Sequence, residues 1–416
     1  MSPDSTTRVP AAAPGCRVRW GGDAAWDELP IPPGLAAFDH FGVSVALADH
    51  HLLVGADGDD RLGQDAGAAY LYERDVDGAW SAPLALVAGD GAAEDHLGWT
   101  VDIDGDVAVI AAPGRARDGH AEAGVVIVFE RGPDASGHDG WHETAVLTAP
   151  VARTGARFGE ALRVRGDLIL VGAPWDDGPG RDAGMAYLFE RVHGAWSLAT
   201  SFAPAAPMSN AHFGSAVALG DGDLAIGAEG QGAAYLYTRH VAVWWPVARL
   251  TPSDTGPKAR FGASLDLSGD DLLVGAEDQV VDGLAGAGGV WAFARVAGAS
   301  EPGGWQARGR LPTIAGTRSH FGTAIRIDGS QAVIGAWGAP RDGAPPTGAT
   351  FVYAHIKGQW LLQAGLAPPD VRADDRLGLG VALAGTTLVA GAWGDDTPGR
   401  DAGRVVVFDA PDRAGR

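Results

Sequence analysis

The chain has 416 residues and a formal net charge of −21 at neutral pH, and its composition is 46% hydrophobic and 20% charged. That is enough apolar material for a core and excludes a disordered chain. The acidity disfavours nucleic-acid binding and association with anionic lipid, no apolar run is long enough for membrane insertion, and the single cysteine, Cys16, excludes an intramolecular disulfide.

Residues 1–19 show no basic region followed by an apolar stretch, so no secretory signal is predicted in the chain as given. We predict that this segment is a flexible N-terminal extension and that residues 411–416 form a C-terminal tail. The repeats lie between them.

One unit recurs seven times, about 56 residues apart on average. Each copy opens with an anchor, Phe or Leu followed by Gly, that begins an alternating stretch. A second segment ends in Gly-Ala or Ala-Ala, and a third opens with Gly and alternates toward aromatic or aliphatic residues. This period of two, rich in β-branched and aromatic residues, predicts strands. The anchors are Phe41, Leu97, Phe158, Phe213, Phe261, Phe321 and Leu377.

A fourth strand carries one tryptophan at a nearly fixed distance before the next anchor. Trp26 stands in this position before Phe41, whereas the last copy ends after Phe408 without a fourth strand of its own. An N-terminal strand at Trp26 would therefore complete the last unit, and segment 17–20 is an alternative with a poorer register. The other tryptophans of this kind are Trp80, Trp141, Trp196, Trp244, Trp305 and Trp360.

These patterns predict an all-β fold over residues 20–410: a seven-bladed β-propeller with four antiparallel strands per blade, closed by the N-terminal strand. We expect the Gly-Ala positions to let neighbouring blades approach closely and the anchor aromatics to wedge between blades. Residues facing the axial channel are expected to be mostly small and apolar.

The Phe-Gly anchors, with Gly-Ala or the full Val-Gly-Ala-Pro form at 171–174, resemble the FG-GAP repeat. That repeat builds the propeller head of integrin α subunits and of many bacterial surface or secreted proteins. The resemblance implies a non-enzymatic binding head, a place outside the cell or on its surface, and often bound calcium. Because no signal segment is visible, a cytoplasmic location stays open.

The integrin calcium sites are not carried over to this chain. In integrins a run of alternating Asp lies between the first two strands of a blade, whereas the connection here is a tight turn. Asp102, Asp104 and Asp106 come nearest to that run, but the turn is too short to wrap a cation with six to eight oxygens.

Acidic residues gather instead between the second and third strands, where three copies share Asp-Asp-x-x-Gly-x-Asp-Ala-Gly. Carboxylates around a turn glycine suit a hard cation, so these aspartates are candidate calcium ligands. Capping of the turn by Asp side chains is the alternative. The candidates are Asp59, Asp60, Asp65, Asp176, Asp177, Asp182, Asp395, Asp396 and Asp401.

The residue before every anchor is basic or imidazole, and we expect it at the same rim as the acidic loops. Ion pairs and hydrogen bonds to loop carboxylates would explain this pattern, and a ring that binds an anionic ligand is the alternative. These candidate binding residues are His40, His96, Arg157, His212, Arg260, His320 and Arg376.

Trp175, Trp337 and Trp393 lie just after the Gly-Ala segments and are further binding candidates. Tryptophans there can stack on a sugar or enter a partner's pocket, or else pack under the loops.

No catalytic motif is present: there is no Gly-x-Ser-x-Gly, His-Glu-x-x-His or phosphate loop. The sequence therefore predicts a monomeric, non-enzymatic binding or adhesion propeller that presents one rim to a protein or glycan partner. The alternatives are a polysaccharide-active enzyme or lectin on the same scaffold, and a surface or matrix component without a discrete ligand.

Overall fold

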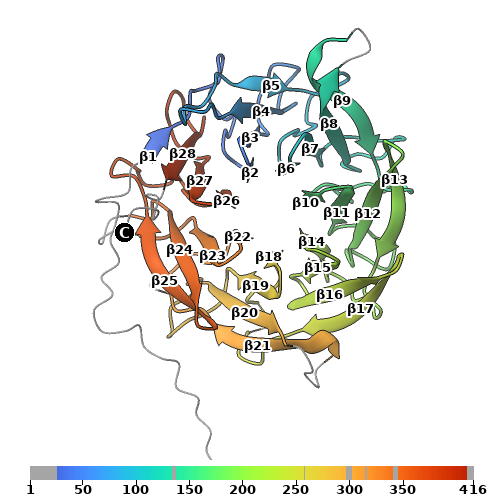
Figure 1. The fold of residues 1–416 in the computed structure, drawn as a ribbon, viewed down its shortest axis with the longest axis vertical. Coiled ribbons are helices and arrows are strands. Elements are labelled where there is room, and N and C mark those ends of the chain that lie inside the picture. The colour runs from blue at the N-terminus through green and yellow to red at the C-terminus, as the bar shows by residue number, and fades with distance from the viewer. Residues whose placement is uncertain are drawn as a thin grey trace, which may run out of the picture.

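Seven four-stranded antiparallel sheets stand around a central axis in the computed structural model (Figure 1). It describes residues 26–409 except 134–136, 257, 297–301, 314–315 and 341–344. The predicted extension 1–19 with Cys16, the alternative closing segment 17–20 and the tail 411–416 lie outside the described residues. Among the described residues, no helix is long and apolar enough to cross a membrane.

The blades follow one another in chain order, and each runs from an inner to an outer strand (Figure 1). Blade 1 contains β2 (Val45–Ala48), β3 (His51–Ala56), β4 (Ala68–Glu73) and β5 (Leu84–Leu86). Blade 2 contains β6 (Val101–Asp104), β7 (Val107–Ala112), β8 (Val125–Pro133) and β9 (Asp139–Leu147). Blade 3 contains β10 (Ala161–Arg165), β11 (Leu168–Ala173), β12 (Met185–Val192) and β13 (Ala195–Phe202). Blade 4 contains β14 (Phe213–Leu219), β15 (Asp223–Ala228), β16 (Ala233–His240) and β17 (Val243–Leu250).

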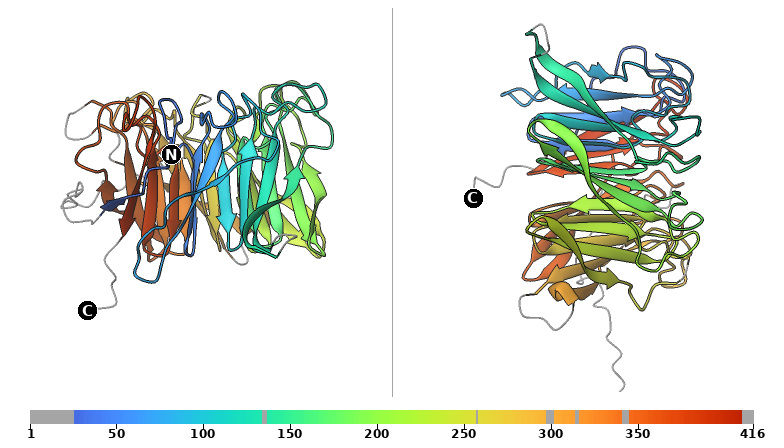
Figure 2. Two further views of the ribbon diagram at one scale, coloured as in Figure 1. Left: turned by 90° about the horizontal axis from the view of Figure 1, so that it is seen from above. Right: turned by 90° about the vertical axis from the view of Figure 1, so that its right-hand side faces the viewer.

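Blade 5 contains β18 (Ser264–Ser268), β19 (Asp271–Ala276), β20 (Gly289–Arg295) and β21 (Trp305–Arg310), with the 3₁₀ turn η1 (Pro302–Gly304) before its last strand. Blade 6 contains β22 (Ile325–Asp328), β23 (Gln331–Ala336), β24 (Ala349–Ile356) and β25 (Gln359–Leu366). Blade 7 contains β26 (Val381–Ala384), β27 (Thr387–Ala392), β28 (Arg404–Asp409) and β1 (Trp26–Glu28). Seen edge-on, the connecting loops gather on the two faces of a disc (Figure 2).

The ring closes through the N-terminal strand, as predicted. β1 pairs antiparallel with β28, with Trp26 opposite Phe408, and the blue strand lies beside the red one in Figure 1. The guanidinium of Arg404 lies 5.3 Å from the Trp26 ring centroid and pairs with Glu28. Closure gives the last sheet four strands, as in the other blades. The array of blades therefore has no open end.

Glycine in the second strand is required by the approach of neighbouring blades. A Cβ atom on Gly55 would lie 1.9 Å from the carbonyl oxygen of Gly98 in the next blade. At the closure, a Cβ on Gly391 would lie 1.9 Å from that of Gly42. No side chain fits in these positions, which confirms the predicted role of the Gly-Ala segments.

The anchors fill the space between blades, also as predicted. Phe41 is buried among Val389 and Val405 of blade 7 and Tyr70 of its own blade, with its ring centroid 5.7 Å from that of Tyr70. Each such side chain contributes roughly 1.5–3 kcal/mol by leaving water. The core is therefore a circle of apolar clusters between adjacent sheets.

The outer tryptophans lie in or beside the fourth strand and contact a basic residue of the third strand. The guanidinium of Arg191 lies 5.3 Å from the Trp196 centroid, and that of Arg295 5.1 Å from the Trp305 centroid. In blade 1, Trp80 precedes the short strand β5 and forms a single bridge with Arg74. This contact explains the fixed register of the tryptophans.

Candidate functional site

The seven residues before the anchors, here called the basic ring, share one backbone conformation. All have left-handed φ values between 51° and 57°. Where the acidic loops occur, the ring residue's N–H bonds to the last Asp of the preceding blade: His40 to the carbonyl of Asp401 and His96 to that of Asp65. The basic ring and the acidic loops therefore share one rim, as expected. A left-handed non-glycine residue costs about 1–2 kcal/mol, which the surrounding contacts must offset.

A second set of rim residues follows directly on the second strand of each blade, and we call them the strand-exit residues. Sequence reasoning identified only the tryptophans among them and missed the acids, although their fixed place after the small-residue strand was a usable signal. The strand-exit residues are Asp57, Pro113, Pro174, Glu229, Glu277, Trp337 and Trp393.

Asp57 joins the basic-ring residues of blades 1 and 2. Its carboxylate lies 3.2 Å from Nδ1 of His40 and 3.4 Å from Nδ1 of His96. Burial alone would raise the pKa of Asp57, but its contacts with the two imidazoles lower it. Its hydrogen bond in turn raises the pKa of His96. One buried carboxylate thus links blades 1 and 2.

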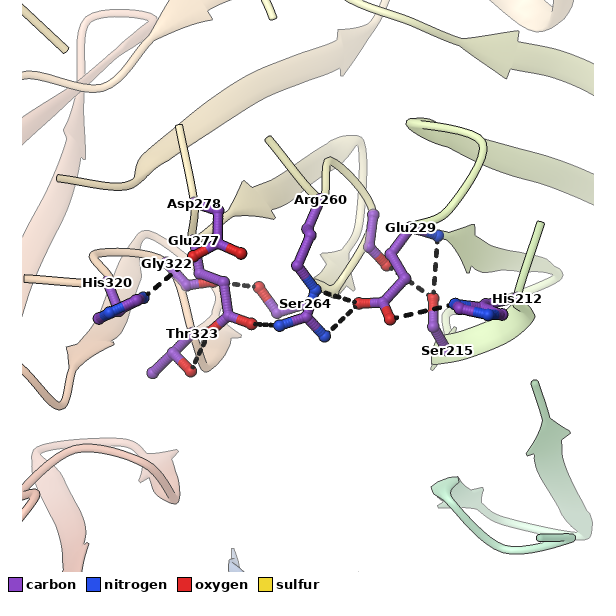
Figure 3. Close-up of polar contacts among 11 residues, drawn as sticks. His212, Ser215, Glu229, Arg260, Ser264, Glu277, Asp278, His320, Gly322 and Thr323 are labelled. Carbon is purple, nitrogen blue, oxygen red and sulfur yellow. Dashed lines mark hydrogen bonds and ion pairs between the residues drawn. The ribbon is translucent and has the colours of Figure 1, made fainter. Parts of the chain in front are cut away.

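A longer polar chain crosses blades 4 to 6 (Figure 3). The Nη2 of Arg260 lies 2.6 Å from Oε2 of Glu229, and its Nη1 donates to Glu277. Glu229 also lies 3.5 Å from Nδ1 of His212, and Glu277 accepts a 2.9 Å hydrogen bond from Thr323. Burial would raise the pKa of Glu229, but His212 and Arg260 lower it. Glu229 is therefore an ionised partner of cations rather than a proton donor.

The three candidate tryptophans pack on the basic ring. The Trp175 ring centroid lies 4.1 Å from that of His212, and the Trp337 centroid 4.2 Å from that of His320. Trp393 contacts Arg376, whose guanidinium is 4.3 Å from the ring centroid. The ring of Trp393 also meets that of His40 edge-on, with centroids 4.8 Å apart. Packing therefore covers part of each indole. Each nevertheless keeps some exposure, 37% for Trp175.

Two cavities open at this rim. One, of about 400 Å³, lies at the mouth of the axial channel and is lined largely by residues between the anchors and the first strands, among them Trp99 and Glu160. The other, of about 570 Å³, lies over blades 5 to 7 and is lined by Arg260, Glu277, Asp278, His320, Thr323, Trp337, Arg376, Leu379 and Trp393. The first was not predicted, although its lining residues recur two positions after the anchors.

Glu160, at the mouth of the channel, differs from Glu229 in the direction of its pKa shift. Burial raises its pKa, which Arg157 partly offsets through a 2.8 Å contact. The guanidinium of Arg157 also lies 5.1 Å from the ring centroid of Trp99.

The axial channel is more polar than predicted. Asp102, Arg163, Asp266 and Arg326 come from the first strands of blades 2, 3, 5 and 6 and line the cavity at the other end of the channel. Asp102 accepts a hydrogen bond from the backbone N–H of Val164, and Asp266 accepts one from Ile327. Burial lowers the pKa of Arg326 to about 10. The expectation of mostly small, apolar residues was wrong because inner strands expose backbone N–H groups that carboxylates can satisfy.

The acidic loops use their aspartates within the protein. Asp59 accepts hydrogen bonds from Arg61 and Tyr70. Asp176 accepts them from Arg153 at 2.8 Å, from Tyr187 at 2.8 Å and from the N–H of Gly178 at 2.7 Å. Asp395 accepts a 2.8 Å bond from the N–H of Thr397 and lies 3.7 Å from Arg404.

The second aspartate of each loop bonds to the backbone of the third. Asp60 accepts from the N–H of Asp65, Asp177 from that of Asp182, and Asp396 from that of Asp401. In the part of the chain described, no three His, Cys, Asp or Glu residues are grouped so as to hold a metal ion. This donor set fits turn caps paired with arginine and does not fit a calcium ion, because guanidinium groups already neutralise the first carboxylate of each loop.

Comparison with sequence families agrees with this architecture. The profile of the FG-GAP repeat matches residues 31–72, 80–129, 141–189, 244–293 and 360–408, together more than half of the chain. The chain belongs to the FG-GAP repeat family. Each match begins near the outer strand of one blade and ends with the third strand of the next. The anchors Phe213 and Phe321 of this FG-GAP propeller fall outside the matches, and the structure shows that they open blades of the same kind.

Among curated proteins, no sequence matches the FG-GAP propeller. Among solved structures, the RRP9 WD40 repeats are 10% identical with a TM-score of 0.54, covering 94% of this chain and 99% of that one. U3-55K is 11% identical with a TM-score of 0.51, covering 88% and 95%. A putative 6-phosphogluconolactonase from Bacteroides uniformis is 14% identical with a TM-score of 0.49, covering 77% and 83%. At such identities the likeness of the first two concerns the fold alone.

Proposed function

We propose that this FG-GAP propeller is a non-enzymatic binding module that presents its basic-ring face to a protein or glycan partner. The observation that carries the proposal is the gathering of Trp99, Trp175, Trp337 and Trp393, with charged side chains beside them, around two cavities of one rim. Partly exposed indoles held by neighbouring side chains are typical of binding hot spots, and cavities with a few fixed polar groups are typical of ligand sites.

Electrostatics support binding over catalysis. General acid catalysis by a carboxyl group needs a raised pKa, whereas Asp57 and Glu229 have lowered pKa values because cations surround them. Glu160 has a raised pKa, but its carboxylate is in contact with Arg157. Burial raises the pKa values of Asp39 and Asp375 to about 6, but these two residues line neither cavity. We also propose work outside the cell or at its surface, on the resemblance to integrin heads alone.

Parallel arrays of glycans and peptides, probed with the intact purified chain, test this proposal. We expect a defined subset of compounds to bind, with binding lost in Trp337→Ala and Trp393→Ala. Arg165→Gln, in the first hairpin turn of blade 3 at the other end of the channel, is the control and should bind normally. Chemical conversion of a bound compound, or loss of binding only in Arg165→Gln, would contradict the proposal.

A further inference from the structure

Arg376 differs from the rest of the basic ring in its partners. The other six members each lie within 4 Å of a carboxylate: His40 and His96 at Asp57, Arg157 at Glu160, His212 and Arg260 at Glu229, and His320 at Asp278. Among the described residues, Arg376 has no carboxylate partner; its guanidinium lies over the Trp393 ring.

In the part of the chain that the structure describes, Arg376 lacks a carboxylate partner because tryptophans take the place of acids at the nearby strand-exit positions. Blades 1, 4 and 5 carry Asp57, Glu229 and Glu277 there, and these acids pair with four ring members, His40, His96, His212 and Arg260. Arg157 and His320 pair instead with Glu160 and Asp278. Blades 6 and 7 carry Trp337 and Trp393 instead. The strand-exit residues of Arg376's own blade and of the preceding blade are thus both indoles, and its charge is left for a ligand.

The surroundings of Arg376 add further recognition groups. It lines the 570 Å³ cavity together with both tryptophans, Thr323 and Asp278, whose side chain is 38% exposed. In the described part of the chain, the buried Nε1 of Trp393 has no hydrogen-bond acceptor. Figure 3 shows Asp278 and Thr323 flanking His320 and Glu277 on this side of the rim. The cavity therefore combines aromatic surface, a guanidinium without a carboxylate partner among the described residues and a partly exposed carboxylate.

We propose that this cavity binds a single carboxylated sugar, such as the terminal uronic acid of a glycan. The inference rests on the proposed binding function and names its ligand. The C–H face of a pyranose suits an indole surface, and a sugar carboxylate suits the fork of Arg376. Sugar hydroxyls can donate to the carboxylate of Asp278.

Overall charge limits the ligand to few negative groups. The net charge of −21 repels a long polyanion, whereas the local charge of Arg376 accommodates one carboxylate. An acidic peptide would also offer a carboxylate. The sugar is favoured because two tryptophans and hydroxyl-binding groups converge on the same cavity.

Calorimetric titration tests the proposal with methyl glucuronide, methyl glucoside, inorganic phosphate and a blocked glutamate as probes. We expect the glucuronide to bind about tenfold or more tightly than the glucoside, because a charge-assisted pair is gained. Arg376→Gln should abolish this difference with at most a small fall in the melting temperature, since the guanidinium has, within the described chain, only its contact with the Trp393 ring to lose. Arg165→Gln should keep the wild-type preference.

Equal binding of the two sugars, a preference retained in Arg376→Gln, or tighter binding of phosphate or blocked glutamate would overturn the carboxylated-sugar assignment. The array separates the two levels of failure. If other compounds bind and this binding is lost in Trp337→Ala and Trp393→Ala, but the glucuronide does not bind, only the assignment of the ligand is refuted. Absence of rim-dependent binding to any array compound refutes the binding function as well.

Discussion

The imidazole of His320 lies flat on the indole of Trp337, with ring centroids 4.2 Å apart and an angle of 10° between the planes. The same imidazole lies 3.3 Å from the carboxylate of Asp278 in the preceding blade. One basic-ring residue thus links two blades and fixes the orientation of an indole. The rim is therefore held in shape before any partner arrives, which lowers the entropic cost of binding.

Asp57→Asn should destabilise the protein in a pH-dependent way. The raised folded pKa of His96 means that its pairing stabilises the fold below the unfolded value of about 6.5 and is lost as pH rises through the folded value. We expect the variant to lose about 1–3 kcal/mol of unfolding free energy at pH 6 and less at pH 8.5.

Urea denaturation at the two pH values measures this loss. Asp77→Asn, in an exposed turn, is the control and should change the free energy of unfolding by less than about 0.5 kcal/mol. Equal losses for Asp57→Asn at both pH values would show that His96 does not titrate against Asp57.

Protonation of Asp39 and Asp375 should make the protein more stable in mild acid than at neutral pH. Burial raises the pKa of each to about 6, although each accepts a backbone hydrogen bond, from Ala36 and Arg372 respectively. The folded state therefore binds more protons than the unfolded state between about pH 4 and 6, and stability falls as pH rises through this window.

Asn keeps the acceptor oxygen without the charge. Asp39→Asn with Asp375→Asn should therefore raise the melting temperature at pH 8, because each change removes a charge whose burial costs up to about 3 kcal/mol of unfolding free energy. At pH 4.5 the difference between the variant and the wild type should be clearly smaller than at pH 8. A lower melting temperature at pH 8 would mean that the charged carboxylates stabilise the fold.

Gly391→Ala should prevent proper closure of the ring. Its methyl group would lie 1.9 Å from the backbone oxygen of Gly42, so a whole blade must move. We expect a loss of more than about 3 kcal/mol, or an insoluble protein. Gly132→Ala is the matched control, because a methyl group there meets no atom within 4 Å. Similar melting curves for the two variants would contradict the predicted close approach of the blades.

Asp176→Ala should cost about 1–3 kcal/mol whether or not calcium is present, because the carboxylate caps a turn and pairs with Arg153. Thermal melts in EDTA and in millimolar Ca²⁺, with Mg²⁺ as reference, check this. A Ca²⁺-selective rise in the wild-type melting temperature that disappears in Asp176→Ala would instead establish the loops as cation sites by linkage.

Much of the fold could be predicted because its information is local and repeated. Each anchor, Gly-Ala strand and outer tryptophan is visible within one copy, and seven copies in register leave few architectures open. The closing strand at Trp26 was predicted because the last copy lacks its fourth strand. These features depend on spacing along the chain and need no knowledge of contacts.

The site was predicted only in part, because its contacts join different copies. The basic ring and the rim tryptophans were identified by position, yet Asp57, Glu229 and Glu277 were missed. Their role depends on partners in neighbouring blades, such as His96 for Asp57 and Arg260 for Glu229. The charged channel residues were missed for the same reason, since Arg163 meets Asp266 across the axis at 3.6 Å.

The claim that the basic-ring face is the binding surface is tested most directly by amide hydrogen exchange. Exchange is measured on the chain alone and with a compound that binds it on the arrays. We expect new protection confined to the segments around Trp337, Arg376 and Trp393 and their neighbours on that rim. Protection at the first hairpin turns, such as that after Arg165 at the other end of the channel, or along the outer strands, would contradict the claim.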